Sequence, residues 1–225
     1  MTRKKLSAGQ QAMLEHKIHV QPDAYARSDS SVQEQLDTGW QGALLLANLL
    51  AKLPEPALRW WARQPAGHIL LTADDTKYVA GRLDATGRDL AGVSVLPLAL
   101  VVRQPRAALV RALLPLDHLL GCQGAENGPW LSDGGGVSPR WLSIGVQIAR
   151  LFPLGYGLSP AAQKDPHLYL AEGLAAALTD RRRLNTADPK LERILKTSIL
   201  SANFWERFLQ EEDRGWKTGF HTQAP

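Results

Sequence analysis

Residues 107–121 read AALVRALLPLDHLLG, and this stretch decides the fold. Its apolar side chains recur at the three- and four-residue spacing of a helix, so Val110 and Leu114 fall on one face. Such a face is typical of a helix buried in a protein core. Arg111 and Pro115 interrupt the run, which is shorter than the roughly 18 apolar residues of a membrane-spanning helix. Pro115 removes one backbone hydrogen bond and predicts a kink.

The composition bounds the class of protein. The chain has 225 residues and a mass of 24.7 kDa, which is enough for one sizeable globular domain. Its single cysteine, Cys122, excludes an internal disulfide. The basic N-terminal residues precede no apolar run of the kind found in signal peptides, which predicts a cytoplasmic protein without a membrane partner. The formal charge of +4 is only mildly basic.

The first part of the chain predicts helices. Residues 1–25 are polar and are expected to be loosely attached. Apolar residues at helical spacing then predict one helix from Ser31 to Leu53, where Pro54 stops it, and a second helix over Pro56–Arg63.

The rest of the chain predicts a small sheet followed by more helices, and thus an α+β, mainly helical fold. A turn region is expected at residues 84–92. Three β-compatible runs predict the strands, at residues 67–72, 76–81 and 93–102. Four capping residues, each followed by proline, predict helix starts at Ser138-Pro139, Ser159-Pro160, Asp165-Pro166 and Asp188-Pro189.

Two segments resemble parts of zinc peptidases. Leu116–Gly121 (LDHLLG) is similar to the tail that follows the HExxH motif in zincins related to the anthrax lethal factor protease domain. Tyr169–Gly173 (YLAEG) resembles the later helix that carries the glutamate ligand of those enzymes. The order and spacing of the similar segments agree over residues 67–200. The resemblance implies a zincin-like fold.

The residues that bind zinc in such relatives are replaced here. HExxH places two histidines one helical turn apart, with a glutamate that polarises the zinc-bound water. When the chain is aligned on LDHLLG, Val110 and Leu114 occupy the histidine positions. Arg111 occupies the glutamate position, and its charge would repel a dication. The resemblance therefore implies a degenerate motif with no catalytic residue and no bound metal.

Glu172 is the one family ligand that is retained. A buried glutamate without zinc needs a partner, so we expect an ion pair between Glu172 and Arg111, with solvent exposure as the alternative. His167 lies five residues earlier, about 140° around the same helix, so His167 and Glu172 are not expected to share a site.

His118 extends the face of the degenerate motif by one more turn. It is interpreted as a hydrogen-bonded structural histidine, since in active relatives the equivalent histidine is not a metal ligand. The alternative is a residual site, able to hold zinc, that draws on His118, Asp133, Glu172 or His167. The glycine-rich loop around 134–136 lacks the lysine of a phosphate loop, and Cys122 carries no recognisable nucleophile signature.

Six of the seven tryptophans fall into two groups. Trp40, Trp141 and Trp205 fit apolar helical stripes and are expected in the core. Trp60, Trp61 and Trp130 lie near the ends of elements, where an exposed indole could contact a partner.

These observations predict a catalytically degenerate zincin-like pseudo-peptidase that acts as a protein- or peptide-binding or regulatory module. One alternative is an active metallopeptidase with non-standard zinc ligands. Another is a nucleic-acid-binding accessory protein that uses its arginine clusters. The predicted organisation is a helical N-terminal extension at 1–66, a zincin-like domain at 67–212 and a C-terminal tail at 213–225.

Overall fold

The computed structural model describes residues 6–217, with side chains described as far as residue 212. The described strands are β1 (Ile18–Val20), β2 (Ala66–Thr72), β3 (Lys77–Ala85) and β4 (Arg88–Pro97). The α-helices are α1 (Ala8–His16), α2 (Ala24–Arg27), α3 (Ser30–Gln33), α4 (Gly39–Leu50), α5 (Glu55–Arg63), α6 (Leu98–Arg103), α7 (Pro105–Cys122), α8 (Pro139–Leu151), α9 (Pro166–Thr179), α10 (Arg181–Ala187), α11 (Pro189–Thr197) and α12 (Ala202–Lys217). Two short 3₁₀ helices are η1 (Leu131–Asp133) and η2 (Phe152–Leu154).

The four strands form one mixed sheet in the order β1-β2-β4-β3. Strands β1, β2 and β4 are parallel, whereas β3 and β4 form an antiparallel hairpin. Thr86 and Gly87 connect the hairpin, and both have positive φ angles, as a two-residue turn that matches the strand twist requires. The turn expected within residues 84–92 is thus present, but it covers only Thr86 and Gly87, because the paired strands continue through the rest of that region.

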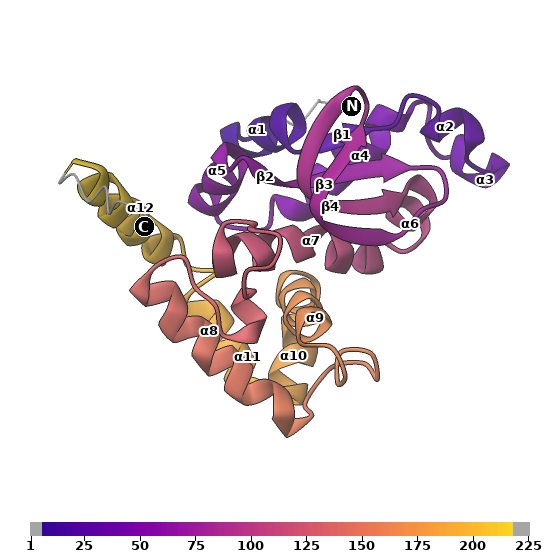
Figure 1. Cartoon of the computed structure of the whole chain (residues 1–225). Helices are drawn as coiled ribbons and strands as arrows, with labels where there is room; N and C mark the ends of the chain where they lie inside the picture. Colours follow the sequence, from indigo (N-terminus) through magenta and orange to yellow (C-terminus); the bar gives the residue numbers. More distant parts are fainter. Residues whose placement is uncertain (1–5, 218–225) are drawn as a thin grey trace.

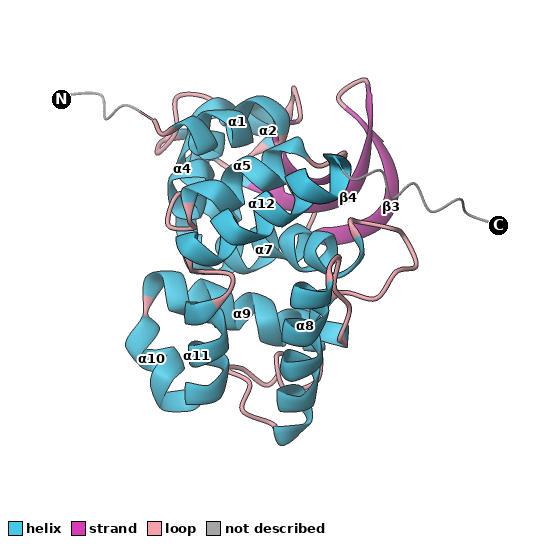
Figure 2. Ribbon diagram, turned by 90° about the vertical axis from the view of Figure 1, so that its left-hand side faces the viewer, coloured by secondary structure: helices cyan, strands magenta, loops and turns pink. Residues whose placement is uncertain are grey.

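Helix α7 lies at the centre of the molecule. It packs against β2 and β4 on one side and against α9 on the other. Figure 1 shows it between the sheet above and helices α8–α11 below. The turned view in Figure 2 shows α1, α4, α5 and α12 gathered on the sheet side of α7. This mainly helical α+β arrangement confirms the expected fold class.

The N-terminal segment is part of the core, so the expectation of loose attachment for residues 1–25 is wrong. Ile18 pairs with Ile69 of β2, and Met13 and Lys17 are both buried. The Lys17 ammonium donates hydrogen bonds to the backbone oxygens of Gln64 and Ala66. Burial lowers the pKa of Lys17 to about 8. Residues 1–5 lie outside the described part of the chain.

Helix boundaries were predicted best where a side chain caps the helix. Ser138, Asp165 and Asp188 each accept a backbone N–H at the start of α8, α9 and α11, which confirms three of the four predicted starts. Ser159 accepts the N–H of Ala162 in the same way, but only a turn follows it.

Two long predicted elements are divided. The helix predicted from Ser31 to Leu53 is broken between α3 and α4, where Gln41 instead hydrogen-bonds the backbone and side chain of Asp37. The strand predicted at 93–102 ends at Pro97, which precedes the first turn of α6. The predicted tail at 213–225 lies partly in α12 and otherwise outside the described residues.

Three tryptophans differ from the predicted burial, one by being exposed and two by being buried. Trp40 is 60% exposed on α4, although it was expected in the core. Trp60 and Trp61 were expected near a partner surface but are only 2% and 0% exposed. Trp61 donates its indole N–H to the carbonyl oxygen of Gly67 at 2.8 Å. Trp141 and Trp205 are buried as predicted. No helix among residues 6–217 is long and apolar enough to cross a membrane.

Candidate functional site

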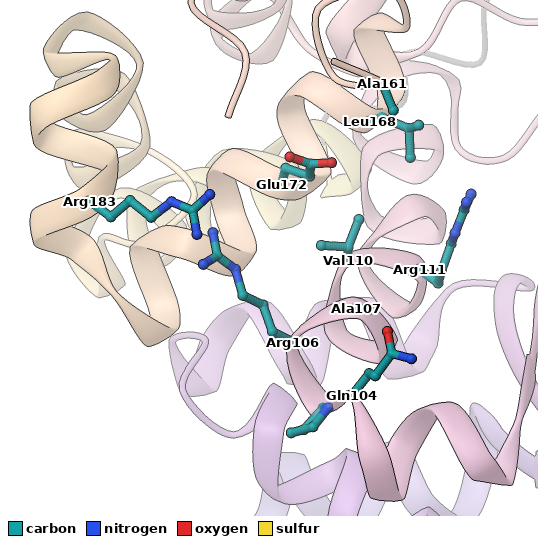
Figure 3. A pocket seen from close by; sticks show the side chains of 10 residues that line it. Gln104, Arg106, Ala107, Val110, Arg111, Ala161, Leu168, Glu172 and Arg183 are labelled. Carbon is teal, nitrogen blue, oxygen red and sulfur yellow. The ribbon is translucent and has the colours of Figure 1, made fainter. Parts of the chain in front are cut away.

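A pocket of about 510 Å³ opens where the N-terminal half of α7 faces α9 and α10. Val110 and Arg111 line it together with Glu172 of α9 (Figure 3). Leu114, which the resemblance to zincins places at the second histidine position, lies one turn further along α7 and is 4% exposed. Arg111 and Glu172 are 61 residues apart in the sequence and thus line one pocket.

The expected ion pair between Glu172 and Arg111 is wrong. Glu172 instead accepts a hydrogen bond from the Ser159 hydroxyl at 2.7 Å. Figure 3 shows the Arg111 side chain extending past Val110, on the far side of that residue from Glu172. The backbone oxygen of Arg111 accepts the Ser94 hydroxyl at 2.8 Å, which ties this turn of α7 to β4.

Two further arginines line the pocket, Arg106 from the first turns of α7 and Arg183 from α10. Their guanidinium groups point toward each other in Figure 3. Among the side chains that the structure describes, no acidic group lies within ion-pair distance of either one. Two arginines close to them in sequence do form ion pairs, Arg103 with Asp29 and Arg181 with Glu192.

The residues at the pocket do not fit a zinc ion. Protein zinc sites use three or four nitrogen, sulfur or oxygen ligands. Val110 and Leu114 offer hydrocarbon, and Glu172 is the single carboxylate that lines the pocket. Among the side chains of residues 6–212, no group of three or more His, Cys, Asp and Glu is arranged to hold a metal.

His118 lies deep in the molecule, on a different side of α7. The Tyr78 hydroxyl is 2.7 Å from Nδ1, and Nε2 lies 2.9 Å from the carbonyl oxygen of Ala125. The imidazole stacks on Trp130 with ring centroids 4.7 Å apart. Burial lowers the pKa of His118, because the charged form loses its hydration. Both ring nitrogens are therefore engaged, as in a structural histidine.

Asp117 forms the centre of a second buried network. Its carboxylate accepts the backbone N–H of Ser132 at 2.9 Å and the Ser132 hydroxyl at 2.6 Å. His167 Nδ1 lies 2.9 Å from Ser132 Oγ and 3.8 Å from Asp117. These contacts connect α7, η1 and α9 through side chains that are far apart in sequence.

The charges of this network influence one another. Burial raises the pKa of Asp117, and the nearby His167 imidazole and the hydrogen bonds from Ser132 oppose that rise. Burial alone would lower the pKa of His167, but the carboxylates of Asp117, Asp133 and Asp165 raise it above its usual value. The imidazolium form of His167 is therefore stabilised in the folded protein.

Ser132, His167 and Asp117 are residue types found in serine hydrolases, but their geometry is not catalytic. Ser132 is 1% exposed, so a substrate carbonyl has no route to its hydroxyl. The serine proton is also directed at Asp117 rather than at the imidazole. In a working triad the histidine accepts the serine proton and the acid holds the histidine. The arrangement fixes structure and performs no nucleophilic step.

Three residues of the expected residual site gather around Trp130, whereas Glu172 lies apart and lines the pocket. The Trp130 ring centroid is 4.7 Å from that of His118 and 4.0 Å from that of His167, and Asp133 lies 3.8 Å from His167 Nε2. Among the described side chains, these residues do not form a group that could hold a metal. His167 and Glu172 occupy separate surroundings, as their spacing predicted. Sequence reasoning missed Ser132 and Tyr78. The signal for such partners was Asp117 itself, since a carboxylate inside an apolar helix needs hydrogen-bond donors from elsewhere.

Comparison of the chain with protein-family models, with curated proteins and with solved structures gives no match. The similarity to zincins therefore stays a prediction from short sequence segments.

Proposed function

We propose that this protein is a catalytically degenerate zincin-like pseudo-peptidase that binds a peptide segment of a partner protein. One observation carries the proposal. The position where the resemblance puts the zinc site is an open pocket lined by Val110, Arg111 and Glu172, with a donor set that does not fit zinc. Such a scaffold retains a place for a ligand after the means of hydrolysis are lost.

The pocket has the features of a binding site for a small group. Its volume of about 510 Å³ lies within the usual range of ligand pockets, roughly 300–1,000 Å³. Val110, Ala161 and Leu168 supply an apolar wall, and charged side chains are placed around it. This combination suits one or two side chains of a bound peptide.

An edge strand near the pocket supports the idea of an extended ligand. β3 is at one end of the strand order, so one side of its backbone is free of a strand partner. Tyr78 of β3 is paired with Ser94 of β4, and Ser94 donates to the backbone oxygen of Arg111. The free edge of β3 is thus separated by β4 from the turn of α7 that carries Arg111. Addition of a strand to such an edge is a common mode of peptide recognition.

Panning of the purified full chain against a displayed library of random dodecapeptides tests this function. We expect a consensus sequence to be enriched and the corresponding synthetic peptides to remain uncleaved. Ala161→Trp should fill the pocket and weaken binding, whereas Ala202→Trp, an exposed change on α12, should not. Failure to enrich any consensus, or equal binding by both variants, would contradict the proposal.

A gain-of-metal experiment tests the zincin-like ancestry. Combining Val110→His, Arg111→Glu and Leu114→His restores HExxH opposite Glu172. We expect this variant to bind one zinc per chain, as measured by elemental analysis after gel filtration, and to lose it when Glu172→Ala is added. A restored motif that folds but binds no zinc would reject the ancestry.

The same preparations decide between the alternatives. Stoichiometric zinc in the unmodified chain, with chelator-sensitive cleavage of the peptides, would favour an active metallopeptidase. Salt-sensitive binding of RNA or DNA in place of peptide would favour the nucleic-acid alternative.

A further inference from the structure

Arg106 and Arg183 create an unbalanced positive charge inside the pocket. They come from different helices, α7 and α10, and their guanidinium groups point toward each other across the pocket (Figure 3). Two like charges that line one pocket repel each other, and among the described side chains no carboxylate lies within ion-pair distance to compensate them. An anion placed between them would remove the repulsion.

Glu172 does not supply that anion. Its carboxylate accepts the Ser159 hydroxyl and is turned toward the segment that contains Ala161. The pocket therefore has a positive side formed by Arg106 and Arg183 and a negative point at Glu172. A ligand group with one negative charge fits the positive side, whereas a second negative charge beside Glu172 would be repelled.

We infer that the pocket binds a carboxylate of an acidic peptide, held between Arg106 and Arg183. This inference rests on the proposed peptide-binding function and names the chemistry that the peptide carries. A guanidinium presents parallel N–H donors that match the two oxygens of a carboxylate, so two arginines can hold it from both sides. Val110 and Leu168 then provide an apolar surface for the adjacent residue of the peptide.

The surrounding charges favour a peptide over a nucleic acid. Nucleic-acid binding uses an extended positive surface that contacts several phosphates. Of the arginines beside the pocket, Arg103 pairs with Asp29 and Arg181 pairs with Glu192, whereas exposed Arg182 has no ion pair among the described side chains. These pairs leave a short positive region at the pocket and not an extended one.

Peptides enriched from the dodecapeptide library provide the probe. We expect the consensus to contain Asp or Glu next to an apolar residue. Replacement of that acid by its amide should weaken binding about 10-fold or more, since hydrogen bonds to charged groups contribute more than neutral ones. A second library displayed with free C-termini tests the other source of a carboxylate, the end of a chain.

Variants of the two arginines complete the experiment. Arg183→Gln and Arg106→Gln should each weaken the acidic peptide about 10-fold and leave the affinity of its amide counterpart unchanged. Arg182→Gln is the matched control, because Arg182 is exposed on the same helix, carries the same charge and does not line the pocket. Arg183 is exposed, so its replacement is not expected to affect folding, which thermal unfolding verifies.

The outcomes separate the two proposals. An enriched consensus without an acidic residue overturns the carboxylate inference and leaves peptide binding intact, whereas the absence of any consensus in either library rejects both. An equal loss of affinity in Arg182→Gln overturns the inference, because the effect would then reflect overall charge. Displacement of the acidic peptide by polyuridine at low micromolar concentration would also overturn it in favour of nucleic-acid binding.

Discussion

Replacement of Asp117 by Asn tests the buried network that connects α7, η1 and α9. The substitution keeps the size of the side chain and removes its charge. An Asn oxygen can still accept the N–H of Ser132, while its amide group must face the Ser132 hydroxyl. Ser132 then has to donate to His167 Nδ1, which is able to accept only when the imidazole is neutral. The variant is therefore compatible with neutral His167 and incompatible with the charged form.

The magnitude follows from the change in hydrogen bonding. Hydrogen bonds to a charged group contribute about 1.5–3 kcal/mol and neutral ones about 1 kcal/mol. Two such bonds from Ser132 are affected, and relief of the cost of burying a carboxylate offsets part of the loss. We expect Asp117→Asn to lower the free energy of unfolding by about 1 kcal/mol at pH 8.

At pH 5.5 the loss should be larger. The folded-state pKa of His167 is raised, so its contribution to stability is fully present below the unfolded value of 6.5 and is lost as pH rises through the folded value. Without Asp117 that contribution disappears. The loss at pH 5.5 should then exceed the loss at pH 8.

Urea unfolding at both pH values measures the stability, and an NMR titration of the His167 ring proton measures the pKa. Asp133→Asn is the control, because the Asp133 side chain is 37% exposed and should shift the pKa of His167 less. Equal destabilisation at the two pH values would refute the reasoning, since it would mean that Asp117 is already neutral when His167 titrates.

Three further predictions concern other parts of the fold. Burial lowers the pKa of both His19 and His68 to about 4. The free energy of unfolding of the wild type should therefore fall as the pH drops from 6.5 toward 4. His68→Gln should make this fall smaller, as measured by urea unfolding at several pH values. Gly145→Ala should lower the stability of the fold by at least about 1–3 kcal/mol, because a Cβ at this position would overlap the carbonyl oxygen of Gly135. The control is Ser143→Ala at an exposed position of α8, which should leave the thermal unfolding midpoint unchanged. Trp61→Ala should lower the free energy of unfolding by about 3–5 kcal/mol, because Trp61 is buried. Trp40→Ala, at an exposed position, should change it by less than about 0.5 kcal/mol. Similar losses of stability in both variants would contradict the assigned burial.

The sequence predicted features that depend on neighbouring residues. A cap and a proline determine where α8, α9 and α11 begin, because the hydrogen bond involved spans only a few residues. The apolar run of α7 predicted a buried helix, since nearly every residue of its second half meets the core. Local patterns of this kind do not depend on the rest of the fold.

Features that depend on distant residues were predicted poorly. β1 is three residues long, and it exists because Ile18 meets Ile69 across 51 positions of sequence. Trp40 lies on a helical stripe that happens to face outward, while Trp60 and Trp61 are covered by segments that the sequence does not place. For the site, the sequence identified Val110, Arg111 and Glu172 through a resemblance, but their common pocket depends on how α7 and α9 pack.

The hydrocarbon at the positions that the resemblance assigns to metal ligands has a structural consequence. If zinc once held α7 and α9 together, its loss would remove an interaction that spans both helices. Val110 and Leu114 are 9% and 4% exposed, and burying an aliphatic side chain of this size contributes about 1.5–3 kcal/mol. Two such side chains can hold α7 against its neighbours without a metal. The apolar wall of the proposed binding site is then preformed, whereas the exposed Arg183 side chain would still have to be ordered when a ligand binds.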